Sequence, residues 1–88
     1  MDLGKLKLEY NHNGNAVQIF NSPKVCSLVI NGSVSDQYTG LVATKFCLNG
    51  IIFADDHLIN VKAEMGYLNM RLYINDVLVA KKFMGFGW

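Results

Sequence analysis

The sequence predicts an all-β domain, an antiparallel β-sandwich or flattened barrel of about seven to nine short strands joined by tight hairpins. Three observations support this fold class. Asn-Gly and Asn-Asp pairs stand between runs rich in β-branched and aromatic residues. Apolar and polar residues alternate with a period of two, and turn-forming residues recur about every eight to ten positions. Helical periodicity of 3.6 is not sustained over any window of about eleven residues.

The clearest turn signal is a short phrase that occurs twice. Residues 28–34 are LVINGSV and residues 72–78 are LYINDVL, while CLNGII at 47–52 is a weaker echo. An Asn-Gly or Asn-Asp pair between two apolar runs is typical of a tight β-hairpin. The phrase could mark a duplicated unit. Recurrence of common hairpin chemistry is the simpler explanation, because the match degrades beyond the phrase itself.

Four strands are expected in the first half of the chain, over residues 5–10, 16–20, 25–30 and 33–38. In the first, Leu6, Leu8 and Tyr10 face one side and charged residues face the other, as in a half-solvated strand. Residues 11–15 form a turn by composition, and Pro23 interrupts the pattern because it cannot donate to a ladder. The third strand is apolar on both faces and therefore central, whereas the fourth is more polar and lies at an edge.

Five further strands are expected in the second half, over residues 41–48, 51–54, 58–65, 67–74 and 77–83. Asn49-Gly50 and Asn75-Asp76 would be the turns within two of the hairpins. Gly66 is a further turn candidate, and the segment 55–57 is a polar connection. Continuous strand patterning with no linker predicts a single domain over residues 1–88.

The apolar faces of these strands would meet in one core, which an 88-residue chain is long enough to build without staples. The core residues expected are Leu6, Leu8, Val17, Ile19, Leu28, Ile30, Val42, Phe46, Ile59, Val61, Leu68, Met70, Leu72, Ile74 and Val79.

Composition narrows the function classes. Hydrophobic residues make up 51% of the chain and charged residues 17%, which excludes a disordered protein and leaves apolar surface for a partner. The net charge is +1 and the basic residues are spread along the sequence, so there is no strong nucleic-acid signal. No apolar run approaches the roughly 20 residues of a membrane-spanning helix. The expected partner is a second copy of the chain or another protein.

The two cysteines indicate a reducing compartment. Residues 1–4 show no basic start followed by an apolar stretch, so no signal peptide is expected. Cys26 and Cys47 would then be reduced thiols in a cytoplasmic protein, acting as small buried hydrophobes. A thiol in apolar surroundings is a poor nucleophile, because burial raises its pKa.

One cluster combines residue types used in catalysis and metal binding, namely Asp55, Asp56 and His57. Neighbouring side chains on an extended segment point to opposite sides, so these three would not converge on one ion. The loop at 11–15 offers amides but lacks the carboxylates of a calcium site. We therefore expect no catalytic residues, no metal site and no cofactor, and the protein is not expected to be an enzyme.

Two aromatic features suggest binding. Tyr and Arg alternate on the polar-facing side of the strand at 67–74, a residue combination common at interfaces. Such a row could also stack on bases, as aromatic side chains on sheets do, and the same pattern would suit a second buried face. The chain then ends in an apolar segment that must dock on its own core, on a second copy or on a partner. The binding residues expected from these features are Tyr67, Arg71, Tyr73, Phe83, Met84, Phe86 and Trp88.

These observations favour a non-enzymatic protein-interaction module that self-associates as a homodimer. The alternative is a small-ligand-binding β domain whose ligand is a carbohydrate, a nucleotide or an apolar molecule. That ligand would lie in a cleft between the sheets, lined by Tyr67, Tyr73 and Phe or Met side chains.

Overall fold

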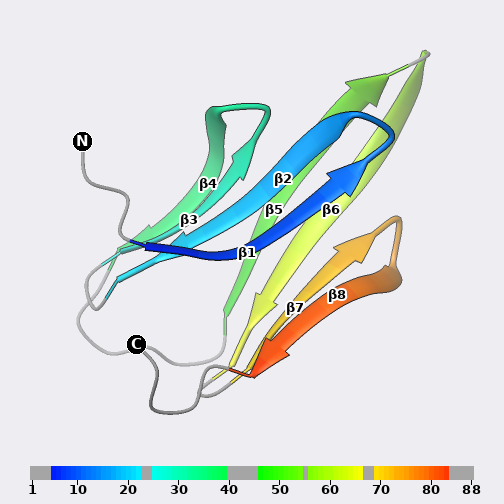
Figure 1. Ribbon diagram of the computed structural model, residues 1–88. Coiled ribbons are helices and arrows are strands. Elements are labelled where there is room, and N and C mark those ends of the chain that lie inside the picture. Colours follow the sequence, from blue (N-terminus) through cyan, green and yellow to red (C-terminus); the bar gives the residue numbers. More distant parts are fainter. Residues whose placement is uncertain (1–4, 23–24, 40–45, 55, 67–68, 84–88) are drawn as a thin grey trace.

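The protein is built from eight antiparallel strands. A computed structural model describes residues 5–22, 25–39, 46–54, 56–66 and 69–83. The strands are β1 (Lys5–His12), β2 (Asn15–Asn21), β3 (Val25–Ile30), β4 (Ser33–Thr39), β5 (Phe46–Ala54), β6 (His57–Met65), β7 (Asn69–Ile74) and β8 (Val77–Phe83). They form an N-terminal sheet in the order β1-β2-β3-β4 and a C-terminal sheet in the order β5-β6-β7-β8 (Figure 1). The predicted fold class is confirmed as a sandwich-like pair of sheets.

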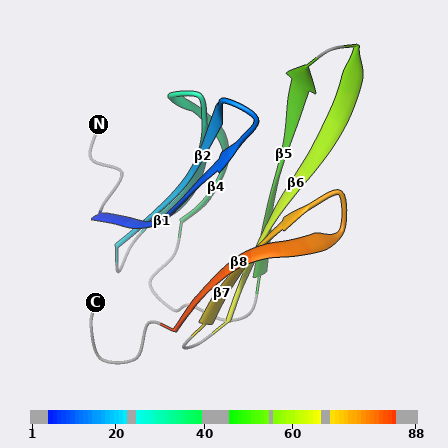
Figure 2. The ribbon, with the colours of Figure 1, turned by 45° about the vertical axis from the view of Figure 1, so that its right-hand side comes forward.

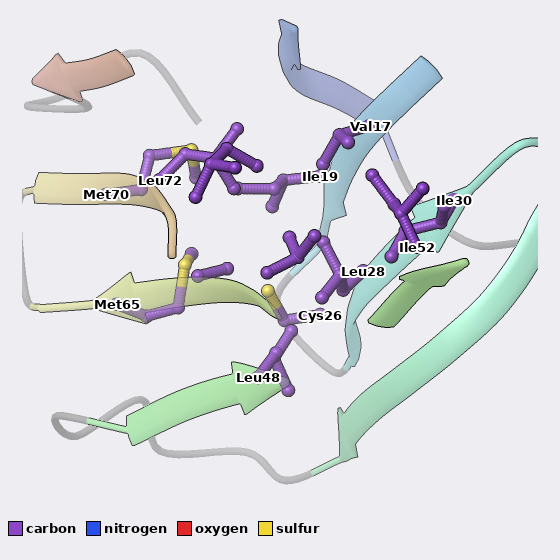
Figure 3. Close-up of a cluster of buried hydrophobic side chains, with 13 residues drawn as sticks. Val17, Ile19, Cys26, Leu28, Ile30, Leu48, Ile52, Met65, Met70 and Leu72 are labelled. Atoms are coloured by element: carbon purple, nitrogen blue, oxygen red, sulfur yellow. The ribbon is translucent and has the colours of Figure 1, made fainter. Parts of the chain in front are cut away.

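The two sheets bury one apolar face each against the other. Strand β5 lies against β3 and β4, and β8 contacts β1. Figure 1 shows the two sheets as separate layers. Side chains from both inner faces interdigitate in the core (Figure 3). The buried members of this core are Val17, Ile19, Cys26, Leu28, Ile30, Leu48, Ile52, Val61, Ala63, Met65, Met70, Leu72 and Ile74.

In three hairpins the structure describes a pair of central turn residues that are both in the left-handed conformation. Both central residues have positive φ at Asn13-Gly14, Asn31-Gly32 and Asn75-Asp76. This is the signature of two-residue type I′ turns, whose twist matches the right-handed twist of the flanking strands. Asn and Gly tolerate this conformation, so the turns predicted at these three positions are confirmed.

The asparagine of the repeated phrase does more than turn the chain. The Asn31 N–H donates to the Ala16 carbonyl at 2.8 Å, and Asn31 Oδ1 accepts the Ala16 N–H at 2.9 Å. Asn75 makes the same two bonds with Asn60, at 2.8 and 2.9 Å. Each turn is thereby attached to the neighbouring strand that precedes its hairpin, β2 in one sheet and β6 in the other. The turns were predictable from the Asn-Gly and Asn-Asp pairs, whereas this attachment depends on strand pairing and was not predicted.

The two sheets also share their strand plan. Strands β3 and β4 correspond to β7 and β8 with a constant shift of 44 positions, from Asn31 to Asn75. Both pairs carry a bulge at the matching point, after Leu28 in one sheet and after Leu72 in the other. The likeness is therefore greater than the repeated phrase suggested. It is broken in the first hairpin of each sheet, since β5 and β6 are longer than β1 and β2.

The turn predicted at Asn49-Gly50 is wrong. Strand β5 continues through both residues and pairs with β6 along its whole length, so the described residues form eight strands instead of nine. A Cβ at Gly50 would lie 2.7 Å from Ile30 Cδ1 and 3.0 Å from Ser35 Cβ. The glycine serves the close approach of the N-terminal sheet to β5, and the chain does not reverse there.

The core prediction holds with one correction among the described residues. Leu6 is 46% exposed, because a bulge between Leu6 and Leu8 shifts the register and turns Leu6 to the outer face. The other predicted core residues are buried or are partly buried against the core. Val42 and Leu68 lie outside the described residues.

Two charged side chains bridge the seams between the sheets. Asp36, on the predicted edge strand β4, accepts the Asn49 N–H of β5 through Oδ2 at 2.9 Å. On the opposite side, Lys82 Nζ of β8 donates to the Lys7 carbonyl of β1 at 2.7 Å. Charges placed on edge strands discourage unwanted strand pairing, and here they also satisfy backbone groups that the ladders leave unpaired.

The close packing at Gly50 can be tested by substitution. Gly50→Ala places a methyl group against Ile30 in the packed core and against the Ser35 Cβ, so we expect a loss of stability of about 1–3 kcal/mol. Gly66→Ala is the matched control, because among the described residues its Cβ would meet the Asn69 carbonyl oxygen alone, at 3.7 Å. Urea denaturation of both variants measures the difference. Equal stability of the two would contradict the packing described.

Candidate functional site

The outer face of the C-terminal sheet carries the predicted binding residues that the structure describes. Arg71 and Tyr73 lie on β7, where Arg71 is opposite Lys81 and Tyr73 is opposite Leu78 on β8. Phe83 lies at the end of β8, opposite Asn69. Tyr73 therefore does not line a cleft between the sheets, because this face points away from the core. Tyr67, Met84, Phe86 and Trp88 lie outside the described residues.

Side chains of β6 hold Arg71 and Tyr73 in place. The Arg71 Nη1 lies 3.4 Å from Glu64 Oε1, with both side chains nearly half exposed. Such an exposed ion pair contributes about 0–1 kcal/mol. The Lys62 Nζ lies 4.8 Å from the centre of the Tyr73 ring, a cation–π contact. Tyr73 is thus partly occupied within its own sheet, which leaves it less available to a partner.

Two of the predicted binding residues, Arg71 and Phe83, lie together. Arg71 and Phe83 line a shallow depression together with Asn69, Lys81 and Lys82. The described lining contains two cationic side chains on the outer face, those of Arg71 and Lys81, and no carboxylate. Lys82 is opposite the buried Met70, so its side chain leaves the sheet on the other face, where it reaches the Lys7 carbonyl. The Phe83 ring is 70% exposed. We call this feature the Arg71–Phe83 depression.

A second feature of the same face was not anticipated as a site. Ile51, Phe53 and Leu58 are 57%, 70% and 63% exposed, although all three are large apolar side chains. Phe53 and Leu58 are direct cross-strand partners at the end of the β5–β6 hairpin. This hairpin projects beyond the rest of the fold (Figures 1 and 2). We call the three residues the hairpin patch.

The signal for the hairpin patch was present in the sequence. Ile51, Ile52 and Phe53 are consecutive, so a strand through them must be apolar on both faces. Ile52 faces the core and is buried, which leaves its two neighbours on the outer face. The false turn at Asn49-Gly50 hid this signal, because it cut β5 into two short strands.

The backbone beside the hairpin patch is an unpaired edge. The Asn49 N–H points away from β6, since it bonds to Asp36. Alternation along an antiparallel strand then points the N–H and C=O groups of Ile51 and Phe53 the same way. The bonds of Asn60 to Asn75 agree, because they show that Asn60, opposite Ile51, directs its backbone groups away from β5. No described strand pairs with this edge.

The acidic and histidine side chains that the structure describes do not gather into a metal-binding cluster. Among the described residues, no group of three or more His, Cys, Asp or Glu side chains is placed to hold an ion. Asp56 occupies the β5–β6 turn with positive φ, and Asp55 lies outside the described residues. The fold does bring His12 and His57 to one polar depression between the hairpin tips of the two sheets. That proximity was not predicted, because it depends on how the two sheets stack.

The cysteines have different environments. Both are free thiols, but Cys47 is exposed on the outer face of β5, so the prediction that it is buried is wrong. Cys26 is buried in the core as predicted. Its burial raises the pKa of the Cys26 thiol to about 12. A thiol that stays protonated at neutral pH is unsuited to nucleophilic catalysis.

Comparison of the chain with protein-family models, with curated proteins and with solved structures finds no match. Within the part of the chain that the structure describes, no helix has the length and apolarity to cross a membrane.

Alkylation distinguishes the two thiols. At pH 8 the native protein should take up one equivalent of iodoacetamide, at Cys47, because Cys26 is buried and protonated. Unfolding in guanidinium chloride should make both react. The raised pKa also means that Cys26 favours the folded state fully below its ordinary pKa of 9.0, and that this contribution is lost as the pH rises toward 12. Labelling of Cys26 in the native protein, detected by peptide mass spectrometry, would contradict the described burial.

Proposed function

We propose that the protein is a non-enzymatic interaction module that self-associates as a homodimer through the hairpin patch. The observation that carries this proposal is the exposure of Ile51, Phe53 and Leu58 together on one projecting hairpin. Contiguous apolar surface is costly to leave in water and is typical of an interaction site.

The hairpin is longer than its counterpart in the other sheet. Asn11↔Ala16 in β1–β2 corresponds to Ile51↔Asn60 in β5–β6, since Ala16 and Asn60 make the same bonds to the turn asparagines. Beyond this point β1–β2 has a single further pair, whereas β5–β6 continues through Ile52, Phe53 and Ala54. The exposed Phe53 and Leu58 belong to this additional length. The C-terminal sheet therefore departs from the shared plan where it exposes apolar side chains.

A second copy of the chain would suit this surface, because its β5 edge can form the missing backbone hydrogen bonds and it brings no like charge to the contact. The free edge of β5 can pair antiparallel with the same edge of another copy, which is the two-fold arrangement of an isologous dimer. The segment from Gly50 to Ala54 contains no charged residue, so two copies would meet there without like-charge repulsion. The pairing would extend the C-terminal sheet and bring the two hairpin patches onto one continuous face.

The expected affinity is modest. Fully burying a large apolar side chain contributes about 1.5–3 kcal/mol, and the residues of the patch are already partly covered. Association costs about 4–15 kcal/mol in lost translational and rotational freedom. Patches of three residues on each copy give a gain of similar size to this cost. We therefore expect a reversible dimer whose population depends on protein concentration.

Removal of the apolar side chains tests the proposal. The double variant Phe53→Ser, Leu58→Ser should be monomeric at concentrations where the wild-type protein is dimeric, as measured by sedimentation equilibrium. Its fold should be retained, because both side chains are largely exposed. The control is Leu6→Ser, Val34→Ser, which removes two exposed apolar side chains from the N-terminal sheet and should leave the dimer intact.

A deletion variant tests whether the hairpin patch or the C-terminal segment forms the dimer contact. Removing residues 84–88 should leave self-association unchanged if the hairpin patch is the contact surface. A monomeric deletion variant beside a dimeric Phe53→Ser, Leu58→Ser variant would contradict the proposal. A wild-type protein that is monomeric at millimolar concentration would contradict it as well.

A further inference from the structure

Folding gathers cationic side chains that the sequence spreads apart. Arg71 and Lys81 are direct cross-strand partners on the outer face of β7 and β8. Lys82 follows in the chain and borders the depression through its backbone, while its side chain lies on the opposite face, because its cross-strand partner is the buried Met70. The bond from Lys82 Nζ to the Lys7 carbonyl brings the β1 backbone to this corner as well. The interleaved charges of the linear sequence concealed this cluster.

The cluster is electrostatically unfavourable for the protein alone. Like charges directly opposite each other across two strands destabilise the sheet. Glu64 lies 3.4 Å from Arg71, but both side chains are nearly half exposed, so the compensation is small. The described lining of the Arg71–Phe83 depression supplies no carboxylate to offset Arg71 and Lys81. An anion bound there would relieve the repulsion.

The other side chains of the depression are suited to a planar, polar group. Phe83 presents a ring that is 70% exposed, although an apolar ring gains nothing from contact with water. Asn69 is its direct cross-strand partner and supplies an amide donor and acceptor beside it. An aromatic face next to cationic side chains is the combination that holds a nucleotide, whose base stacks while its phosphate is neutralised.

We infer that the Arg71–Phe83 depression binds a nucleotide, either free or within a single-stranded nucleic acid. Arg71 and Lys81 would hold the phosphate, because the guanidinium fork and the ammonium can donate to several of its oxygens. Phe83 would stack on the base. Lys82 is held by the Lys7 carbonyl on the opposite face and would make no direct contact. This site is separate from the hairpin patch and does not depend on the proposed dimer.

Three probes test the inference: adenosine, AMP and a fluorescein-labelled oligothymidylate of ten nucleotides. Isothermal titration should show AMP binding at least about fivefold more tightly than adenosine, since only AMP carries the phosphate. Fluorescence anisotropy should show that the oligonucleotide binds more weakly as the salt concentration is raised. A plot of log Kobs against log salt concentration should have a slope of about −0.7 for each phosphate contacted. If the natural ligand is a single-stranded nucleic acid, the oligonucleotide should bind much more tightly than AMP. If the natural ligand is a free nucleotide, the two affinities should be similar.

Variants assign the contacts. The double variant Arg71→Gln, Lys81→Gln should lower AMP affinity at least tenfold, and Phe83→Ala should lower it about fivefold or more through the lost stacking. Lys62→Gln is the matched control, because Lys62 lies on the same face outside the depression and should leave affinity unchanged. Circular dichroism should confirm that each variant is folded. Equal binding of AMP and adenosine would overturn the inference, and so would equal losses in Lys62→Gln and Arg71→Gln, Lys81→Gln.

Discussion

Each sheet depends on an asparagine that joins a hairpin turn to the strand beside it. Asn31 and Asn75 accept the left-handed conformation of a type I′ turn and at the same time bond to Ala16 and Asn60. One residue thereby fixes the hairpin and the register of a third strand. Because side chains alternate with a period of two, a slip of one residue would exchange the inner and outer faces.

The fixed register determines which residues reach each surface. It places Val61 and Leu72 in the core, and it places Arg71 opposite Lys81 on the outer face. In the β5–β6 hairpin the same alternation buries Ile52 and exposes its neighbour Phe53. The two proposed binding features therefore arise from one cause. They lie at different ends of a single face, the hairpin patch where β5 and β6 extend beyond the shared plan and the cationic depression where β7 begins and β8 ends.

The features that could be predicted from the sequence depend on the chemistry of neighbouring residues. The features that could not be predicted depend on contacts between residues far apart in the chain. The three Asn-containing turns follow from residues that tolerate positive φ, so they were predictable. Asn49-Gly50 has the same local chemistry, but its glycine accommodates Ile30 from the other sheet, which no local pattern reveals. The cationic cluster was missed for the same reason. Arg71 and Lys81 meet only because β7 and β8 pair in one register.

The role of the turn asparagines can be measured directly by replacing each with glycine, which keeps the positive φ and removes the side chain. Among the described residues, the Asn13 side chain makes no hydrogen bond, so Asn13→Gly is the control for the backbone change alone. In urea denaturation, Asn31→Gly and Asn75→Gly should each lower the free energy of unfolding by about 1 kcal/mol more than Asn13→Gly does. Equal losses in all three variants would show that the asparagines only turn the chain, and would contradict the account.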